Sequence, residues 1–167
     1  MIVSCLLALV MVVANWTLLA RTTSQLFVAD GPLWWMLAWL VLKSAHELAH
    51  AAVAIRVKSD IRSAGISFIF LAPVPYVDVT DLWSIPNRWN RIACSGAGIT
   101  VEMALASVAV LIAVATSDDS LRYFCCALAS MGTVSTLAFN ANPLMRFDGY
   151  FILSDLLNLP NLWTQSA

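Results

Sequence analysis

The 167-residue sequence has little charge: Asp, Glu, Lys and Arg together make up 11% of it, whereas 60% of the residues are hydrophobic. Soluble domains usually carry about 25% charged residues. The net charge is −1 and the basic residues form no block, so we expect no nucleic-acid partner, because phosphate binding needs clustered Lys and Arg. The mean hydropathy of +0.81 instead predicts an integral membrane protein that contacts the lipid bilayer.

Cysteine motifs are also lacking. The four cysteines lie in apolar segments and form no C-x-x-C pair, which argues against a disulfide framework or a thiolate zinc site. The first apolar run has neither a basic region before it nor an A-x-A cleavage signal. We therefore expect this run to be a retained membrane helix rather than a signal peptide.

Long apolar runs recur along the chain. They predict an all-α membrane protein with about four transmembrane helices in a single membrane-embedded domain, 1–167. The helices are expected at about 2–20, 33–57, 92–115 and 121–139, with a short helix at about 150–158.

The stretch at residues 66–79 is apolar but too short to span a bilayer. Pro73 and Pro75 forbid a continuous helix there, and the β-branched and aromatic residues favour strands. We predict a short extended or re-entrant segment between the second and third helices.

Basic residues are unevenly distributed between the predicted loops. The connection from residue 56 to 91 holds five Lys and Arg residues, whereas the connections at 21–32 and 116–120 hold Arg21 alone. Loops rich in Lys and Arg are retained in the cytoplasm. The long connection is therefore expected to be cytoplasmic, in a multi-pass protein.

Histidine is scarce as well, and both histidines lie in one motif. The segment KSAHELAH, residues 43–50, contains His46 and His50 in an H-E-x-x-H pattern on the second predicted helix. At 3.6 residues per turn the two imidazoles lie one turn apart on one face and can converge on one metal ion, typically Zn2+. Glu47 lies about 100° round the helix from His46, which suits a general base better than a ligand.

Two histidines could also face a polar bundle interior without binding metal. Three ionisable side chains within five residues at membrane depth each cost a few kcal/mol unless they are paired or ligated. This cost favours a functional metal site. Because His46 and His50 lie near the end of the helix that enters the basic loop, the site is expected towards the cytoplasmic side.

A third protein ligand is required for a catalytic zinc site, and no third histidine exists. Pro143 should break the fourth helix, and Asp148-Gly149 then offers a carboxylate on a sharp turn. Asp148 is thus a candidate ligand. The sequence leaves four other carboxylates open: Asp78, Asp81, Glu102 and Asp155.

Several of these segments together resemble a known family. HELAH at 46–50, LAPVPYVDV at 71–79, the G-x-x-x-E segment at 98–102 and NPLMRFDGYFILSDLL at 142–157 occur in this order. The chain resembles the site-2 protease family of intramembrane zinc metalloproteases, and more closely a bacterial branch of peptide zinc metalloproteases. The resemblance covers about residues 33–160 and implies a bacterial plasma-membrane location.

The resemblance implies that His46, His50 and Asp148 hold Zn2+ and that Glu47 activates water. It implies a hydrolase that cuts peptide bonds of membrane-spanning or membrane-associated peptides. Four residues separate Pro143 from Asp148, whereas the commoner family form has fewer. The alternative is a non-catalytic zinc-binding subunit of a peptide export or transport assembly, with additional membrane subunits as partners.

Two further polar residues are weighed for supporting roles. Asn142 either orients the substrate backbone, donates to the oxyanion or caps the helix break, and the resemblance favours a role in the site. Glu102 either accepts a hydrogen bond from a free ring nitrogen of His46 or His50, pairs with Lys43, or is a protonated structural residue.

Overall fold

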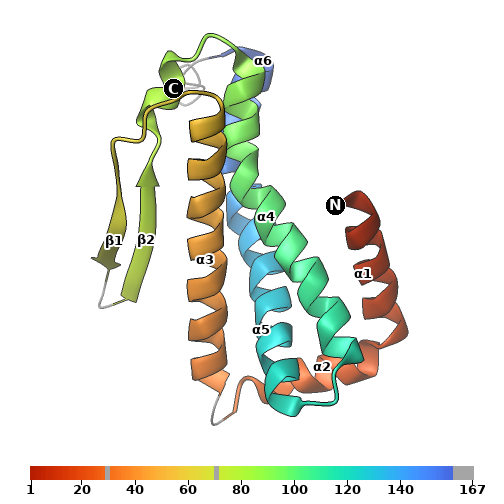
Figure 1. Cartoon of the computed structure of the whole chain (residues 1–167). Helices are drawn as coiled ribbons and strands as arrows, with labels where there is room; N and C mark the ends of the chain where they lie inside the picture. The colour runs from red at the N-terminus through yellow and green to blue at the C-terminus, as the bar shows by residue number, and fades with distance from the viewer. Residues whose placement is uncertain (29–30, 70–71, 160–167) are drawn as a thin grey trace. The chain divides into compact units, whose positions relative to one another are not determined.

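A computed structural model describes residues 1–28, 31–69 and 72–159, which form two compact units (Figure 1). Unit 1 comprises Met1–Lys43 and Thr100–Ser135, and unit 2 comprises Ser44–Ile99 and the chain from Thr136 onward. The elements are α1 (Ile2–Ala14), α2 (Trp16–Gln25), α3 (Gly31–Arg56), β1 (Ser63–Ile69), β2 (Ala72–Asp78), a 3-10 turn η1 (Thr80–Ser84), α4 (Arg88–Ala115), α5 (Asp119–Ser135), a π-helical turn η2 (Thr136–Asn140) and α6 (Asp148–Leu157).

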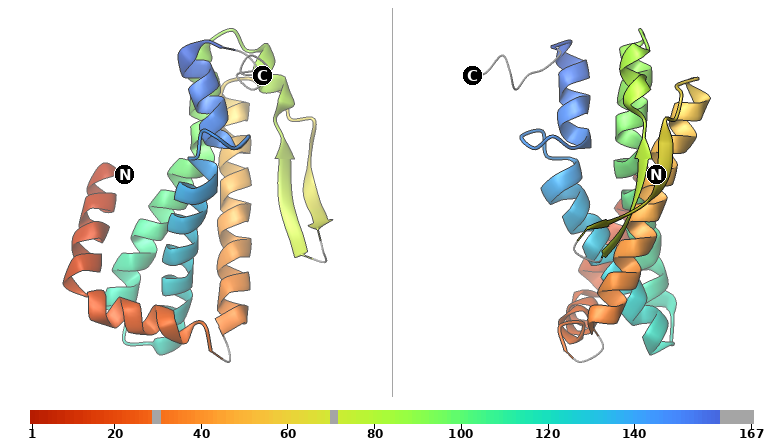
Figure 2. Two further views of the ribbon diagram at one scale, coloured as in Figure 1. Left: turned by 180° about the vertical axis from the view of Figure 1, so that it is seen from behind. Right: turned by 90° about the vertical axis from the view of Figure 1, so that its left-hand side faces the viewer.

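The expected first helix at about 2–20 is wrong as a single helix. In unit 1, α1 and α2 meet at an angle of 86° (Figures 1 and 2). Asn15 at the corner leaves helical geometry with φ −118° and ψ 26°, and its backbone N–H and its side-chain Nδ2 both donate to Met11 O, at 3.0 and 3.1 Å. Asn competes in this way for backbone acceptors, and hydropathy alone does not reveal it.

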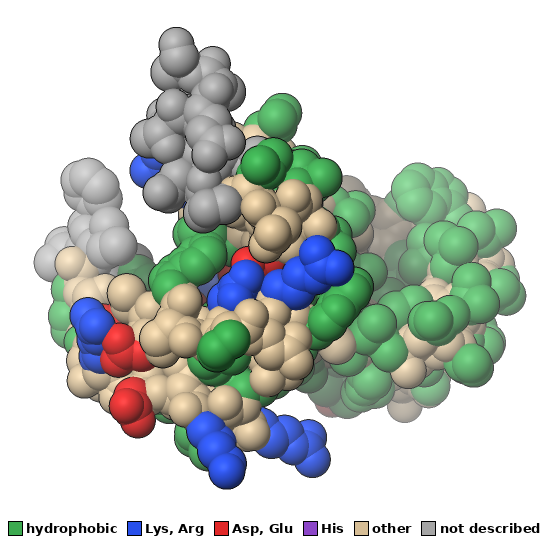
Figure 3. Space-filling view, turned by 90° about the horizontal axis from the view of Figure 1, so that it is seen from above, with side chains coloured by type: hydrophobic (Ala, Val, Ile, Leu, Met, Phe, Trp, Pro, Cys, Tyr) green, Lys and Arg blue, Asp and Glu red, His purple; other side chains and the backbone are tan. Residues whose placement is uncertain are grey.

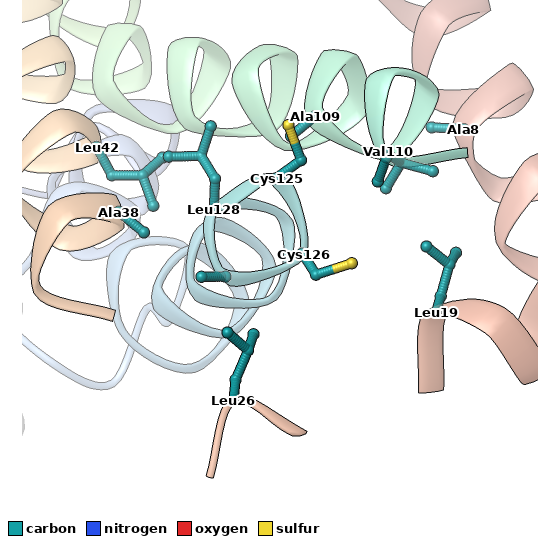
Figure 4. Close-up of a cluster of buried hydrophobic side chains, with 12 residues drawn as sticks. Ala8, Leu19, Leu26, Ala38, Leu42, Ala109, Val110, Cys125, Cys126 and Leu128 are labelled. Atoms are coloured by element: carbon teal, nitrogen blue, oxygen red, sulfur yellow. The ribbon is translucent and has the colours of Figure 1, made fainter. Parts of the chain in front are cut away.

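The core of unit 1 is built from the facing sides of its helices (Figure 4). Its fully or nearly fully buried residues are Leu26, Ala38, Leu42, Ala109, Ala113, Cys125, Cys126 and Ala127. The cysteines are free thiols, as their spacing predicts. Gly132 permits close helix contact, since a Cβ there would lie 3.3 Å from Ala106 Cβ and 3.4 Å from Glu102 O.

A buried ion pair also belongs to unit 1. Lys43 Nζ donates to Glu102 Oε1 at 2.8 Å and to Ser135 Oγ at 2.9 Å. The Glu102 side chain is fully buried. Loss of either charge would leave the other buried and uncompensated, which costs about 3–5 kcal/mol.

The extended segment between α3 and α4 is confirmed, and it forms an antiparallel hairpin that makes the fold more than all-α. Strand β1 pairs with β2 in a register that places Ile66 opposite Pro75 and Phe68 opposite Pro73. The two views of Figure 2 and the view of Figure 1 place this hairpin beside α3, in unit 2. Of the segment expected at 66–79, residues 70 and 71 lie outside the described part.

The other helices begin or end close to the predicted positions, with local reasons for each shift. Helix α4 starts at Arg88 rather than 92 because Asn87 Oδ1 accepts the Trp89 N–H at 3.0 Å, and α5 starts at Asp119 rather than 121 because Asp118 Oδ1 accepts the Leu121 N–H at 2.7 Å. Both are N-cap contacts. The break ahead of Pro143 is confirmed, since η2 ends at Asn140.

One described helix, Arg88–Ala115, is long and apolar enough to cross a membrane, and the bent pair Ile2–Gln25 passes the same criterion when taken together. A buried helix of a soluble protein would meet this criterion too. The expected four crossings are therefore not confirmed by length and hydropathy.

Candidate metal centre

The H-E-x-x-H motif lies on α3 within unit 2, and the helix brings its two imidazoles together as the spacing predicts. His46 Nε2 and His50 Nε2 are 3.0 Å apart. Both side chains are buried, and their ring planes meet at 72°. Two nitrogen atoms so close, each with a lone pair available in the neutral ring, suit a shared cation.

Asp148 joins them from a different segment. It is the first residue of α6, directly after the irregular chain that follows η2. Its Oδ2 lies 3.3 Å from His46 Nε2 and 3.5 Å from His50 Nε2. The three residues form a cluster that could hold a metal ion.

The dimensions of this cluster fit a small tetrahedral cation. Zinc binds imidazole nitrogen and carboxylate oxygen at about 2.0–2.2 Å, which puts neighbouring ligand atoms of a tetrahedron about 3.3–3.6 Å apart. The three observed separations run from 3.0 to 3.5 Å. Asp148 Oδ2 is also buried and has no hydrogen-bond partner among the residues that the structure describes, as expected of an atom meant for a metal.

The protonation of Asp148 agrees with a ligand role. Burial alone would raise the pKa of this carboxyl, but the neighbouring rings of His46 and His50 outweigh it and hold the pKa below its usual value. Even at its ordinary pKa an aspartate is ionised at neutral pH, and the carboxylate is the form that coordinates a cation.

A backbone carbonyl on α4 fixes the tautomer of His50. His50 Nδ1 lies 2.8 Å from Cys94 O, so Nδ1 carries the proton and donates it. Nε2 is then left with its lone pair directed at His46 and Asp148. Such an outer hydrogen bond is the usual way of orienting a ligating histidine.

Two glycines make room for the ligands. A Cβ on Gly98 of α4 would lie 2.3 Å from His46 Cε1 and 2.5 Å from both ring nitrogens, so the ring occupies that space. A Cβ on Gly149 would lie 2.5 Å from the carbonyl group of Ala141, so the start of α6 packs directly on backbone. Glycine is required at both positions by close approach.

Glu47 faces the hairpin. Its Oε2 accepts the backbone N–H of Val77 on β2 at 2.9 Å. One carboxylate oxygen is thus held by a strand of the extended segment, which fixes the side chain. Each carboxylate oxygen has two lone-pair sites, so Glu47 keeps accepting capacity for a proton.

The four rival carboxylates are all engaged elsewhere. Glu102 pairs with Lys43, and Asp155 accepts from Arg91 Nε at 2.8 Å. Asp81 accepts from Arg62 Nε at 3.0 Å, and these hydrogen bonds lower its pKa. Asp78 accepts the backbone N–H of Thr80 at 2.9 Å in a local turn. Of the candidates that the sequence leaves open, the structure brings Asp148 to the histidines.

The two supporting residues have local partners. Asn142 Nδ2 donates to Ala138 O at 3.3 Å and its Oδ1 accepts the Leu144 N–H at 2.9 Å, which is the capping alternative. Glu102 forms the ion pair with Lys43, the second of its three alternatives. An oxyanion contact by Asn142 and a contact of Glu102 with a ligating histidine stay predictions.

Sequence reasoning missed the contacts that Gly98, Cys94 and Val77 make with the residues of the metal site. Cys94 and Val77 act through backbone atoms, which no side-chain motif reveals. The run of small residues at 95–98 indicates that another group approaches this part of the helix closely. Such a run is equally typical of close helix packing, so it does not point to the metal site.

No protein family model, curated protein or solved structure matches the chain in a search of each.

Proposed function

We propose that this chain is an integral membrane zinc metalloendopeptidase that resembles the site-2 proteases and cuts membrane-spanning or membrane-associated peptides. The convergence of His46 Nε2, His50 Nε2 and Asp148 Oδ2 within 3.5 Å carries the proposal. Three protein ligands leave a fourth position for water or substrate, which is the pattern of a catalytic zinc site rather than a structural one.

His46, His50 and Asp148 would hold the zinc ion, which would supply Lewis acidity towards a carbonyl group and would lower the pKa of water at the site to about 7. Glu47 lies next to His46 on the same helix and serves as the general base. Its carboxylate takes the proton of the attacking water and then delivers it to the leaving amine. The Val77 N–H holds Glu47 Oε2 while this happens.

The hairpin supports binding of an extended substrate. A transmembrane helix hides its carbonyl groups in hydrogen bonds, so cleavage requires local unwinding. Because Val77 N–H points away from β1 to Glu47, the alternation of an antiparallel pair places Pro73 and Pro75 on the same outer edge of β2. That edge offers carbonyl acceptors beside the base, to which the amides of an unwound peptide donate.

The proposed membrane arrangement keeps the four crossings that the sequence predicts. They are the bent pair α1–α2, then α3, α4, and α5 together with η2. Figure 3 shows several Lys and Arg side chains, together with some Asp and Glu, on the face seen from above the orientation of Figure 1. In unit 2 five basic residues are exposed: Arg146 lies just before α6, and the other four lie between the end of α3 and the start of α4, at Arg56, Lys58, Arg62 and Arg88. This excess of positive charge favours a cytoplasmic position for that end.

The second candidate is a zinc-binding subunit of a peptide export or transport assembly. A structural zinc site is closed by four protein ligands. In the described part of the chain the metal cluster contains three residues. A set of three protein ligands, one fewer than a closed site needs, is the observation that favours the enzyme.

Metal content and hydrolysis together test the proposal. We expect one zinc ion per wild-type chain purified in detergent, and cleavage of some members of a panel of membrane peptides that stops on chelation and returns with zinc. Replacing Asp148 by Asn should weaken zinc binding by at least about 10-fold, because the carboxylate charge is lost, and should abolish cleavage.

The matched control is Asp60→Asn, which removes the same charge at an exposed position away from the cluster and should behave as wild type. Zinc bound without any cleavage would favour the subunit over the enzyme. Zinc binding that is unaffected by Asp148→Asn would refute the ligand set.

A further inference from the structure

Helix α4 supplies none of the three ligand atoms, yet one of its faces touches every segment that does. Gly98 borders the His46 ring, Cys94 O accepts from His50 Nδ1, and Arg91 binds Asp155 on α6. These three α4 residues are spaced by three and four positions and therefore share a face. The first two contacts reach ligands directly, whereas the third reaches α6 two turns beyond its ligand.

The contact between Arg91 and Asp155 is strong and sheltered. Arg91 Nε and Nη2 lie 2.8 and 2.6 Å from Asp155 Oδ1. Arg91 Nη1 also donates to Ile85 O at 2.6 Å, which ties the guanidinium to the chain just before α4. The side chains are 15% and 5% exposed, so little water competes. Charge-assisted bonds of this kind are about twice as strong as neutral ones and fix orientation.

The side chains of Asp155 and Asp148 project from nearly the same side of α6. The two residues are seven positions apart on α6, which is about two turns, and at 100° per residue they point within about 20° of each other. Holding Asp155 against α4 therefore sets the rotation of α6 about its axis. At the first residue of the same helix, that rotation decides where Asp148 Oδ2 points.

Even a small rotation of α6 about its axis would move Asp148 away from the histidines. At about 5 Å from the helix axis, a rotation of 20° moves a side-chain atom by about 1.7 Å. Metal–ligand bonds tolerate about 0.2 Å. Gly149 packs on Ala141, and Phe151 packs on Trp83 with ring centroids 5.5 Å apart. To these packing contacts the Arg91–Asp155 pair adds a directional bond on the side of α6 that carries Asp148.

We propose that Arg91 is a positioning residue for the metal centre: through Asp155 it fixes the rotation of α6 and so aims Asp148 at His46 and His50. The inference rests on the proposed metal-binding role of these three residues. Arg91 touches no ligand atom, and its effect is exerted along α6 from Asp155 to Asp148. No motif links Arg91 to the site in the sequence.

The test compares Co2+ and Zn2+ binding by the full chain in detergent. Arg91→Met keeps the apolar stem and removes the charge; we expect Zn2+ affinity to fall about 10–100-fold, the range for outer partners of metal ligands. The visible absorption of bound Co2+, which reports coordination geometry, should change. Exchanging the pair, with Arg91→Asp and Asp155→Arg together, should recover part of the affinity.

The control is Arg62→Met, which breaks the exposed pair with Asp81 and should leave affinity and the cobalt spectrum as in wild type. Unchanged affinity and spectrum in a helical Arg91→Met protein, judged by far-ultraviolet circular dichroism, would overturn the proposal. If Arg91→Met loses helical structure, the exchanged pair decides: recovered structure with recovered metal affinity supports positioning, and any other result contradicts it.

Asp148→Asn separates this inference from the ligand assignment. If Asp148→Asn impairs metal binding and Arg91→Met does not, the positioning role alone is wrong. If Asp148→Asn binds metal as wild type does, the ligand assignment is wrong and the positioning role falls with it.

Discussion

Replacing Glu47 by Gln is expected to lower peptide hydrolysis by about 100- to 10,000-fold while one zinc ion stays bound. General acid–base catalysis contributes rate factors of this size. Gln has the shape of Glu, and its amide oxygen can still accept the Val77 N–H that Glu47 accepts. It cannot take a proton from water at neutral pH, so the chemical step alone should fail.

Cleavage rate and zinc per chain must be measured on the same preparation. Asp60→Asn changes the net charge by the same amount at an exposed residue and should cleave at the wild-type rate. A Glu47→Gln protein that still cleaves near the wild-type rate would remove Glu47 from the mechanism. One that has lost its zinc would show that Glu47 supports the metal centre instead.

Replacing Gly98 by Ala is expected to abolish metal binding at affinities near that of wild type. The new Cβ would lie 2.3–2.5 Å from three atoms of the His46 ring, so the ring must leave its place. We expect Zn2+ affinity to fall more than about 100-fold, beyond the usual effect of changing an outer partner of a ligand. Competition with a chelator of known affinity measures this.

Gly96→Ala is the matched control, two residues away on the same helix. A Cβ there would lie 3.8 Å from Ile152 Cδ1, an ordinary contact. Both substitutions gain up to about 1 kcal/mol of helix propensity, so neither variant is expected to fail through loss of the helix. Gly98→Ala with wild-type affinity would mean that the His46 ring does not occupy this space.

The convergence of His46 and His50 could be predicted because it depends on local helix geometry alone. A spacing of four residues puts both rings on one face of any helix, and the structure places their Nε2 atoms 3.0 Å apart. The choice of Asp148 over its four rivals could not be made this way. It depends on how α6 returns to α3, and residues 144–147 leave that path open in the sequence.

Helix ends were predicted to within a few residues where a chemical signal marks them. Pro143 predicted the end of the helical segment that contains α5. Asn87 and Asp118 are the N-cap residues at which α4 and α5 start in the structure. The corner at Asn15 was missed because apolar residues continue on both sides of it. A hydropathy pattern describes burial, whereas the bend is decided by backbone hydrogen bonding at one residue.

The surroundings of the ligands were the least predictable part. The Cys94 carbonyl and the Val77 amide are present whatever the side chain, so their roles become visible only when strands and helices are placed. The pairing of Arg91 with Asp155 links residues 64 positions apart by charge alone. Such pairs are determined by tertiary packing, which one sequence does not specify.

X-ray absorption at the zinc edge of the purified, zinc-loaded protein reports the ligand atoms themselves. We expect two imidazole nitrogens and carboxylate or water oxygens at about 2.0–2.2 Å, in four-coordinate geometry. Sulfur at about 2.3 Å, or a zinc shell without imidazole scattering, would contradict it.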